Sequence, residues 1–194
     1  MIRMLAIGAR VILAAIAGVA TVSKSVAQLP SFPYDLKHEK IVIRTPSPST
    51  MKSFEAKDIT GQIYEAMWPS YAPKVLFTFL AAKPSSIGGK WRILRQSADE
   101  LDSFVRSYVG GLGGTIYSMH SGSEGINPRR TGITFSFTLV ESDVQVYGKG
   151  FAFVDGFEII AFVVAATEEG PLLANICYSR FLGASDYFKP KPIE

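Results

Sequence analysis

The strongest constraint on the fold is a stretch of alternating residues that runs from position 131 to position 166. Side chains that alternate between apolar and polar types point to opposite faces of an extended strand. Two breaks divide the stretch, ESD at residues 141–143 and DG at residues 155–156. Asp-Gly pairs between apolar runs are typical of tight hairpin turns. The pattern therefore predicts three consecutive antiparallel strands.

Helical spacing of apolar residues marks residues 97–109 as the clearest helix. Ser97 and Glu100 have the spacing of a capping box, and apolar residues then recur every three or four positions. Gly110 and Gly111 follow, where a helix commonly ends. A second helix is predicted to begin at Pro171 and to run towards residue 181.

The remaining elements are strands of unequal clarity. Residues 74–82 are apolar at nearly every position, which favours a central strand covered on both faces. Residues 40–44 predict a first strand, and residues 115–119 another. Residues 51–71 are ambiguous, since they fit a strand, a short helix around residues 62–68, or both. The order predicts an α+β fold, a mostly antiparallel sheet with helices packed on it.

Three stretches give this layout a resemblance to a known family. They are KIVIRTPSP near the start, the helix SADELDSFVRSYV, and the hairpin GKGFAFVDGFEIIAFVVAA followed by a segment containing CYSRF. Together they resemble the PsbP-like α/β/α sandwich, which includes photosystem II extrinsic proteins and many exported bacterial proteins. The resemblance implies a non-enzymatic binding or assembly role. It transfers no metal-binding residues, because no ligand motif matches.

The N-terminal 27 residues have the pattern of a secretory signal peptide. Arg3 and Arg10 precede or border an apolar run over residues 11–22, and small residues at Ser25 and Ala27 suit a signal peptidase. We expect cleavage before Gln28, one domain over residues 28–194, and a periplasmic or secreted protein. Retention of the segment as a membrane anchor is the alternative. A cleaved chain would have no stable membrane span.

Cleavage would also balance the charge of the chain. The full sequence has 20 basic and 17 acidic residues, and Arg3, Arg10 and Lys24 lie in the predicted signal. The remaining chain has equal numbers of both signs, which argues against a nucleic-acid partner because such proteins usually carry a basic stripe. The one cysteine, Cys177, lies in an apolar run and is expected to be buried.

Few residues suggest catalysis or metal binding. His38 lies in a charged stretch, where we expect a solvated side chain, and neither histidine belongs to a zinc-binding pattern. We predict neither a metal site nor a cofactor. A hydrolase is the alternative function, in which His120 would act with a nearby serine and an acid. Its candidate catalytic residues are His120, Ser121, Ser123 and Glu124.

Aromatic residues give the candidate binding surface. Tyr147, Phe151 and Phe153 share one face of a predicted strand, and Trp68 and Tyr71 could form the rim of a pocket. If no helix covers that face, it would bind a partner; if a helix does, the rings are core. We therefore predict an exported, non-catalytic binding or assembly protein of the bacterial cell envelope. Its partner would be an envelope protein or a small apolar ligand.

Overall fold

The computed structural model of the protein describes residues 30–39, 41–56, 59–68, 74–86, 88–90, 93, 97–124, 130–167 and 170–189. The predicted signal peptide and Tyr71 lie outside these ranges. The strands are β1 (Tyr34–His38), β2 (Ile41–Thr45), β3 (Thr50–Ala56), β4 (Ile59–Met67), β5 (Val75–Pro84), β6 (Thr115–Glu124), β7 (Arg130–Glu141), β8 (Val144–Asp155) and β9 (Glu158–Ala166). The helices are α3 (Ser97–Gly111), α4 (Gly170–Ala184) and the short 3-10 helix η1 (Asp186–Phe188).

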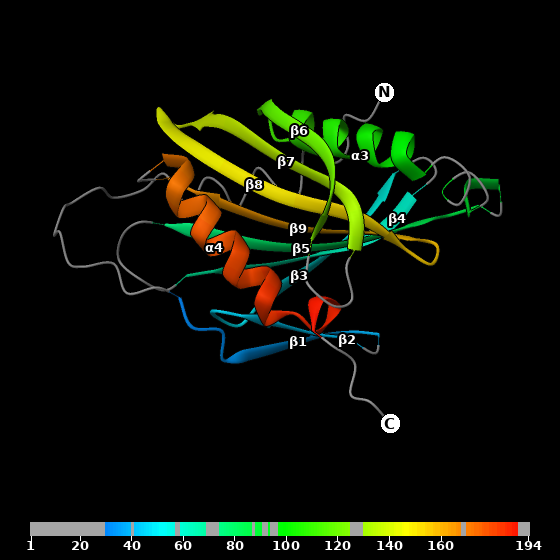
Figure 1. The fold of residues 1–194 in the computed structure, drawn as a ribbon, viewed down its shortest axis with the longest axis horizontal. Helices are drawn as coiled ribbons and strands as arrows, with labels where there is room; N and C mark the ends of the chain where they lie inside the picture. Colours follow the sequence, from blue (N-terminus) through cyan, green and yellow to red (C-terminus); the bar gives the residue numbers. More distant parts are fainter. Residues whose placement is uncertain are drawn as a thin grey trace, which may run out of the picture.

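Seven strands form one antiparallel sheet in the order β3-β4-β5-β9-β8-β7-β6, and β1 pairs with β2 in a separate hairpin (Figure 1). The three predicted strands at residues 131–166 are confirmed as the neighbours β7, β8 and β9. Their turns have the positive backbone angles that tight hairpins need, with φ of 47° at Ser142, 65° at Asp143 and 59° at Gly156. The predicted α+β fold is thus observed.

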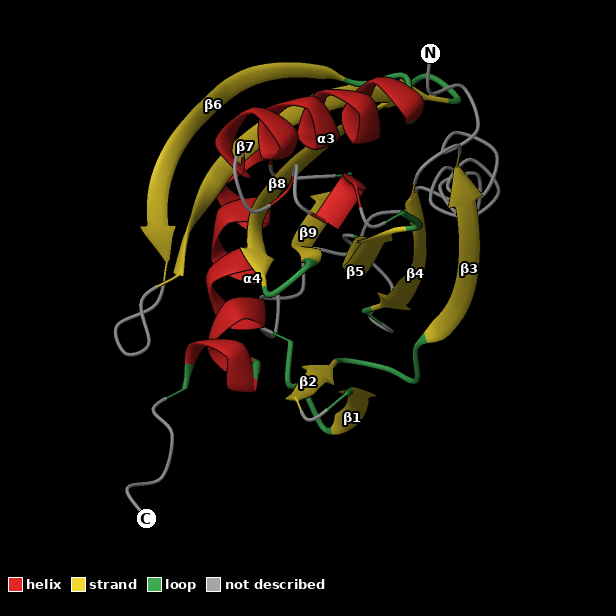
Figure 2. Cartoon of the chain, turned by 90° about the vertical axis from the view of Figure 1, so that its right-hand side faces the viewer, coloured by secondary structure: helices red, strands yellow, loops and turns green. Residues whose placement is uncertain are grey.

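The two faces of the sheet have different covers. Helix α3 packs over β6, β7 and β8, while α4 packs over β8 and β9 on the opposite face. The β1–β2 hairpin and η1 extend the cover on the α4 side, where Leu36 and Ile43 join the same core as Phe77 and Phe79. Figure 2 shows the strong curvature of the sheet between its two edges, β6 and β3.

The ambiguous stretch at residues 51–71 contains strands where it is described. Residues 50–56 and 59–67 form the β3–β4 hairpin, so the alternative of a helix beginning at Gln62 is wrong. Pairing with β3 on one side and β5 on the other satisfies the β4 backbone, and that tertiary pairing outweighs a weak local helical preference. Residues 34–38, for which no strand was predicted, form β1.

Two glycines in β8 allow aromatic rings from β7 to lie flat over the neighbouring strand, on the α3 side of the sheet. The ring of Phe137 lies against Gly148, and that of Phe135 lies against Gly150. A Cβ atom added at Gly148 would stand 2.1 Å from the Phe137 ring. The absence of a side chain at these two glycines lets large rings fill the α3 side of the core.

Candidate binding pocket at the β3–β4 edge

The predicted aromatic surface is mostly core. Phe151 and Phe153 have no exposed surface, because α4 and η1 cover their face of β8. The Phe153 ring centroid lies 5.5 Å from that of Tyr187 and 5.9 Å from that of Phe188. The proposal of these two residues as a contact surface is thus corrected. Their alternation on the strand gave no indication of which face a helix would cover.

The other residues of that predicted surface lie in different environments. Tyr147 is half-buried. Trp68 is buried in the core on the α4 side, and its backbone N–H donates to the carbonyl of Val75 over 2.9 Å. Tyr71 lies outside the described residues. No continuous aromatic patch joins the described members of this group.

The predicted catalytic group is divided between two faces of β6. His120 and Glu124 are separated from Ser121 and Ser123 by strand alternation, which turns neighbouring side chains to opposite sides. Tyr178 donates a hydrogen bond of 3.0 Å to Glu124 Oε1, so this carboxylate is engaged elsewhere. A serine–histidine pair is therefore not assembled, although His120 itself is exposed.

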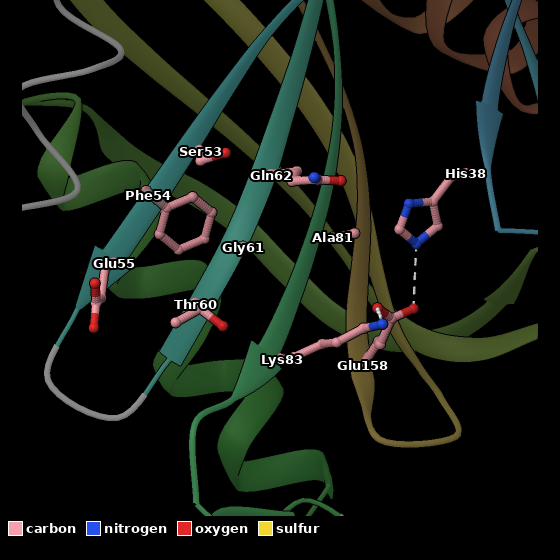
Figure 3. Close-up of a pocket in the computed structure, with 10 residues that line it drawn as sticks. All are labelled: His38, Ser53, Phe54, Glu55, Thr60, Gly61, Gln62, Ala81, Lys83 and Glu158. Carbon is pink, nitrogen blue, oxygen red and sulfur yellow. Dashed lines mark hydrogen bonds and ion pairs between the residues drawn. The ribbon is translucent and has the colours of Figure 1, made fainter.

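A pocket that these predictions missed opens on the α4 side of the sheet, at its β3–β4 edge. Its volume is about 600 Å³, within the range of small-molecule sites. Figure 3 shows its floor on β3, β4 and β5 and its wall at the β1–β2 hairpin. The lining residues are His38, Ser53, Phe54, Glu55, Thr60, Gly61, Gln62, Ala81, Lys83 and Glu158.

The pocket lies where the apolar character of the sheet ends. Near the turn that joins β3 to β4, the side chains on the α4 side are polar, among them Ser53, Thr60 and Gln62, which line the pocket. Further along β4, Tyr64 on the same side packs against the core under α4. On the opposite side Ile63 joins the core under α3. Since a polar strand face gains nothing from an apolar cover, the cover stops at β5 and leaves an open groove.

A partly buried ionic network joins the pocket wall to the sheet. His38 Nε2 lies 3.2 Å from Glu158 Oε2, and Lys83 Nζ lies 2.7 Å from Glu158 Oε1. Lys83 also contacts Glu39 Oε1 over 2.8 Å. The expectation of a solvated His38 is wrong, since only 7 % of the residue is exposed. The network attaches the hairpin to β5 and β9.

Burial favours the neutral form of His38 in this network. Burial lowers the pKa of the imidazole below its ordinary value, the charge of Glu39 raises it, and that of Lys83 lowers it again. A neutral ring that donates through Nε2 to the Glu158 carboxylate fits this environment. The ring also lies beside Phe79, with 5.2 Å between centroids.

Among the described lining residues, the two hydroxyl side chains lie away from Glu158, the partner of His38. Thr60 is opposite Lys83 on the neighbouring strand, and Ser53 is one strand further away, on β3. Because adjacent strands are about 4.8 Å apart, both hydroxyls are well beyond hydrogen-bond reach of Glu158 on β9.

Within the described ranges, no group of three or more His, Cys, Asp or Glu side chains could hold a metal ion. No helix in the described part of the chain is both long and apolar enough to cross a bilayer. Cys177 is buried as expected, and burial raises the pKa of its thiol to about 11.

Solved structures match this chain to different degrees. The solution structure of cyanobacterial PsbP (CyanoP) from Synechocystis sp. PCC 6803 matches with a TM-score of 0.50 and 9% identity, over 87% of this chain and 97% of that one. PA94, a Pseudomonas aeruginosa protein of unknown function, matches with a TM-score of 0.46 and 8% identity, over 82% and 98%. LpqN, involved in cell envelope biogenesis of Mycobacterium tuberculosis, matches with a TM-score of 0.29 and 8% identity, over 76% and 85%.

Comparisons by sequence give no match. No protein-family model matches the chain, and no curated protein matches it significantly in sequence. At 9% identity the likeness to CyanoP concerns the fold alone. The resemblance predicted from the sequence is confirmed at that level: this chain has a PsbP-like fold.

Proposed function

We propose that this chain is an exported, non-catalytic binding protein of the bacterial cell envelope, whose ligand occupies the pocket at the β3–β4 edge. One observation carries the proposal: an open pocket of about 600 Å³ contains a buried, ion-paired carboxylate, Glu158. Buried charges are costly and are rare without a partner or a function. A site with convergent polar groups in a cavity of this size is typical of small-molecule recognition.

The lining favours a polar ligand over the apolar one expected from the aromatic residues. Hydroxyl, amide and charged groups alternate along the floor, while the large rings of β8 are buried beneath α4. An apolar ligand would remove water from these polar groups without replacing their hydrogen bonds. We therefore assign the pocket to a ligand that itself makes hydrogen bonds.

A pocket-filling variant tests this assignment. Thr60→Trp places a large ring on the exposed floor of the pocket. Because aromatic residues are favourable in strands, the substitution should leave β4 intact. Thr115→Trp makes the same change at an exposed position on β6, at the opposite edge of the sheet. Native mass spectrometry of protein purified from its own envelope should show a small-molecule adduct in the wild type and in Thr115→Trp. The adduct should be absent from Thr60→Trp, and its retention there would contradict the proposal.

Export is tested separately. N-terminal sequencing of the native protein should begin at Gln28, as the signal pattern at residues 1–27 predicts. A native protein that still begins at Met1 would remove the basis for an exported role. It would leave the pocket itself untouched.

Assembly with an envelope protein is a second candidate, supported by the free edge of β6. This strand is ten residues long, half of its residues are exposed and none is buried, and it contains no Lys, Arg or Pro. Such edges readily accept a strand from another chain. Ser121→Lys should prevent the co-purification of such a partner, whereas Ser53→Lys on the other edge strand should not. Loss of the partner in both variants, or in neither, would argue against this edge.

A further inference from the structure

The described residues that line the pocket have more acidic than basic side chains. Among them, Glu55 and Glu158 are acidic, and Lys83 is the one formally cationic residue when His38 is neutral. Lys83 is already shared between Glu158 and Glu39, at 2.7 and 2.8 Å. Its charge is therefore more than compensated before any ligand arrives.

Two carboxylates retain unused capacity. Glu55 is exposed at the pocket mouth and forms no ion pair with another residue in the described ranges. Glu158 is 8 % exposed, and its Oε1 atom receives no hydrogen bond in those ranges, although Lys83 lies beside it as an ion-pair partner. In Figure 3 these two acids lie at opposite sides of the pocket.

The floor between them offers hydrogen-bond donors. Gln62 Oε1 accepts a hydrogen bond of 2.7 Å from the Tyr64 hydroxyl, so its amide nitrogen is left to donate. Thr60 adds a hydroxyl that can donate or accept. Two strand spacings of about 4.8 Å separate β3 from β5, so a ligand about 10 Å long would reach from Glu55 to Lys83.

We propose that the pocket binds a small organic cation, with an ammonium or guanidinium group on the Glu55 carboxylate and a hydroxyl- or carbonyl-bearing body on Gln62 and Thr60. This inference rests on the proposed function, because it names the ligand class of the same pocket. A cation brings positive charge to a wall on which carboxylates outnumber cationic groups among the described residues. Its hydrogen bond to a carboxylate is charge-assisted and therefore stronger than a neutral one. An anion would be repelled by the Glu55 carboxylate, which no cation among the described residues neutralises at the pocket mouth.

Matched probe pairs test the charge of the ligand. Glucosamine and glucose differ by one ammonium group, and argininamide and citrullinamide differ by a guanidinium in place of a urea. Isothermal titration of the full chain at low salt should show the cationic member of each pair binding at least about tenfold more tightly. Equal affinity within each pair, or no measurable binding of either cation, would overturn the inference.

Two variants should shift that affinity in opposite directions. Glu55→Gln should weaken the binding of the cation by about fivefold, and Lys83→Met should strengthen it by a similar factor, effects of the size of one exposed ion pair. Asp143→Asn removes a charge from a distant hairpin turn and should change nothing. Shifts of the same sign in Glu55→Gln and Lys83→Met would overturn the inference. Because Glu55 is exposed, that variant remains informative even if Lys83→Met fails to fold.

The outcomes separate this inference from the proposed function. Binding of glucose or citrullinamide that is lost in Thr60→Trp would retain the pocket as a ligand site and reject a cation as its ligand. Probe binding that survives in Thr60→Trp would reject both.

Discussion

Two buried glutamates on opposite sides of the sheet have different surroundings. Glu65 lies on the α3 side, 3.3 Å from Lys52 Nζ, and Glu158 lies on the α4 side, 2.7 Å from Lys83 Nζ. Each has one oxygen that receives no hydrogen bond from the described residues. The cavity beside Glu65 is about 10 Å³, closed by apolar side chains and Tyr108, whereas that beside Glu158 is about 600 Å³.

The comparison shows that a buried carboxylate alone does not identify a binding site. Glu65 has room for little more than one water molecule, so its burial is a cost of packing. That burial also raises the pKa of Glu65, while the charge of Lys52 lowers it. Glu158 has a similar lysine partner and also a histidine, and it faces a space that a ligand can enter.

Tyr108→Ala removes the ring that closes the cavity at Glu65. We expect the free energy of unfolding to fall by about 3–5 kcal/mol, as for other large-to-small changes of buried aromatic residues. Chemical denaturation measures it. A loss below about 1 kcal/mol would mean that α3 does not close this side.

Glu158→Gln tests the open side. The change weakens the ion pair with Lys83 and the hydrogen bond from His38, so the free energy of unfolding should fall by about 1–3 kcal/mol. The same denaturation series measures the change. An unchanged stability would show that the network does not hold the hairpin to the sheet.

Glu65→Gln should have the opposite sign. A neutral amide of the same shape removes a desolvated charge, and Lys52 is exposed enough to be hydrated. We expect the free energy of unfolding at neutral pH to rise by up to about 1 kcal/mol. Since burial raises the pKa of Glu65, the gain should shrink as the pH falls and the wild-type carboxyl becomes protonated. A loss comparable to that of Glu158→Gln would remove the distinction between the two sites.

His38 gives the open side its own pH dependence. Burial lowers the pKa of this imidazole below 6.5; the charge of Glu39 raises the pKa and that of Lys83 lowers it. The unfolded chain therefore binds a proton at His38 more readily than the folded chain does. The contribution of neutral His38 to stability is complete above pH 6.5 and declines as the pH falls below it. Denaturation from about pH 7.5 to about pH 5 should show a shallower slope for His38→Gln than for the wild type. A parallel slope would contradict the lowered pKa.

Glu55→Gln should have the smallest effect on stability. This exposed side chain on the edge strand forms no ion pair with the described residues, so the free energy of unfolding should change by less than about 0.5 kcal/mol. Thermal and chemical denaturation both measure it. A larger loss would mean that Glu55 supports the fold and is not available to a ligand.

Local signals explain which parts of the fold could be predicted from the sequence. Helix α3 and strands β7 to β9 have their own periodicity and turn residues, and all were correctly anticipated. Strand β1 and the β3–β4 hairpin were missed or left ambiguous because their short segments acquire a role only through pairing. The local pattern at residues 97–109 was sufficient to predict a helix, while that at residues 51–71 was not sufficient to decide between strand and helix.

The pocket depends on contacts that no local pattern contains. His38 meets Glu158 across 120 positions in the sequence, and its charged neighbours suggested a solvated residue. The polar alternation of Ser53, Glu55, Thr60 and Gln62 was the signal that could have indicated an uncovered strand face. The burial of Phe151 likewise depended on where α4 lies, which the alternation of β8 does not specify.

Amide chemical-shift mapping tests the central claim most directly. The isotope-labelled chain, titrated with glucosamine, should show shifts concentrated in the pocket-lining parts of β3, β4 and β5, at His38 and at the start of β9. Shifts concentrated at the cavity beside Glu65, around Tyr108 and Leu112, or along β6 would contradict the account.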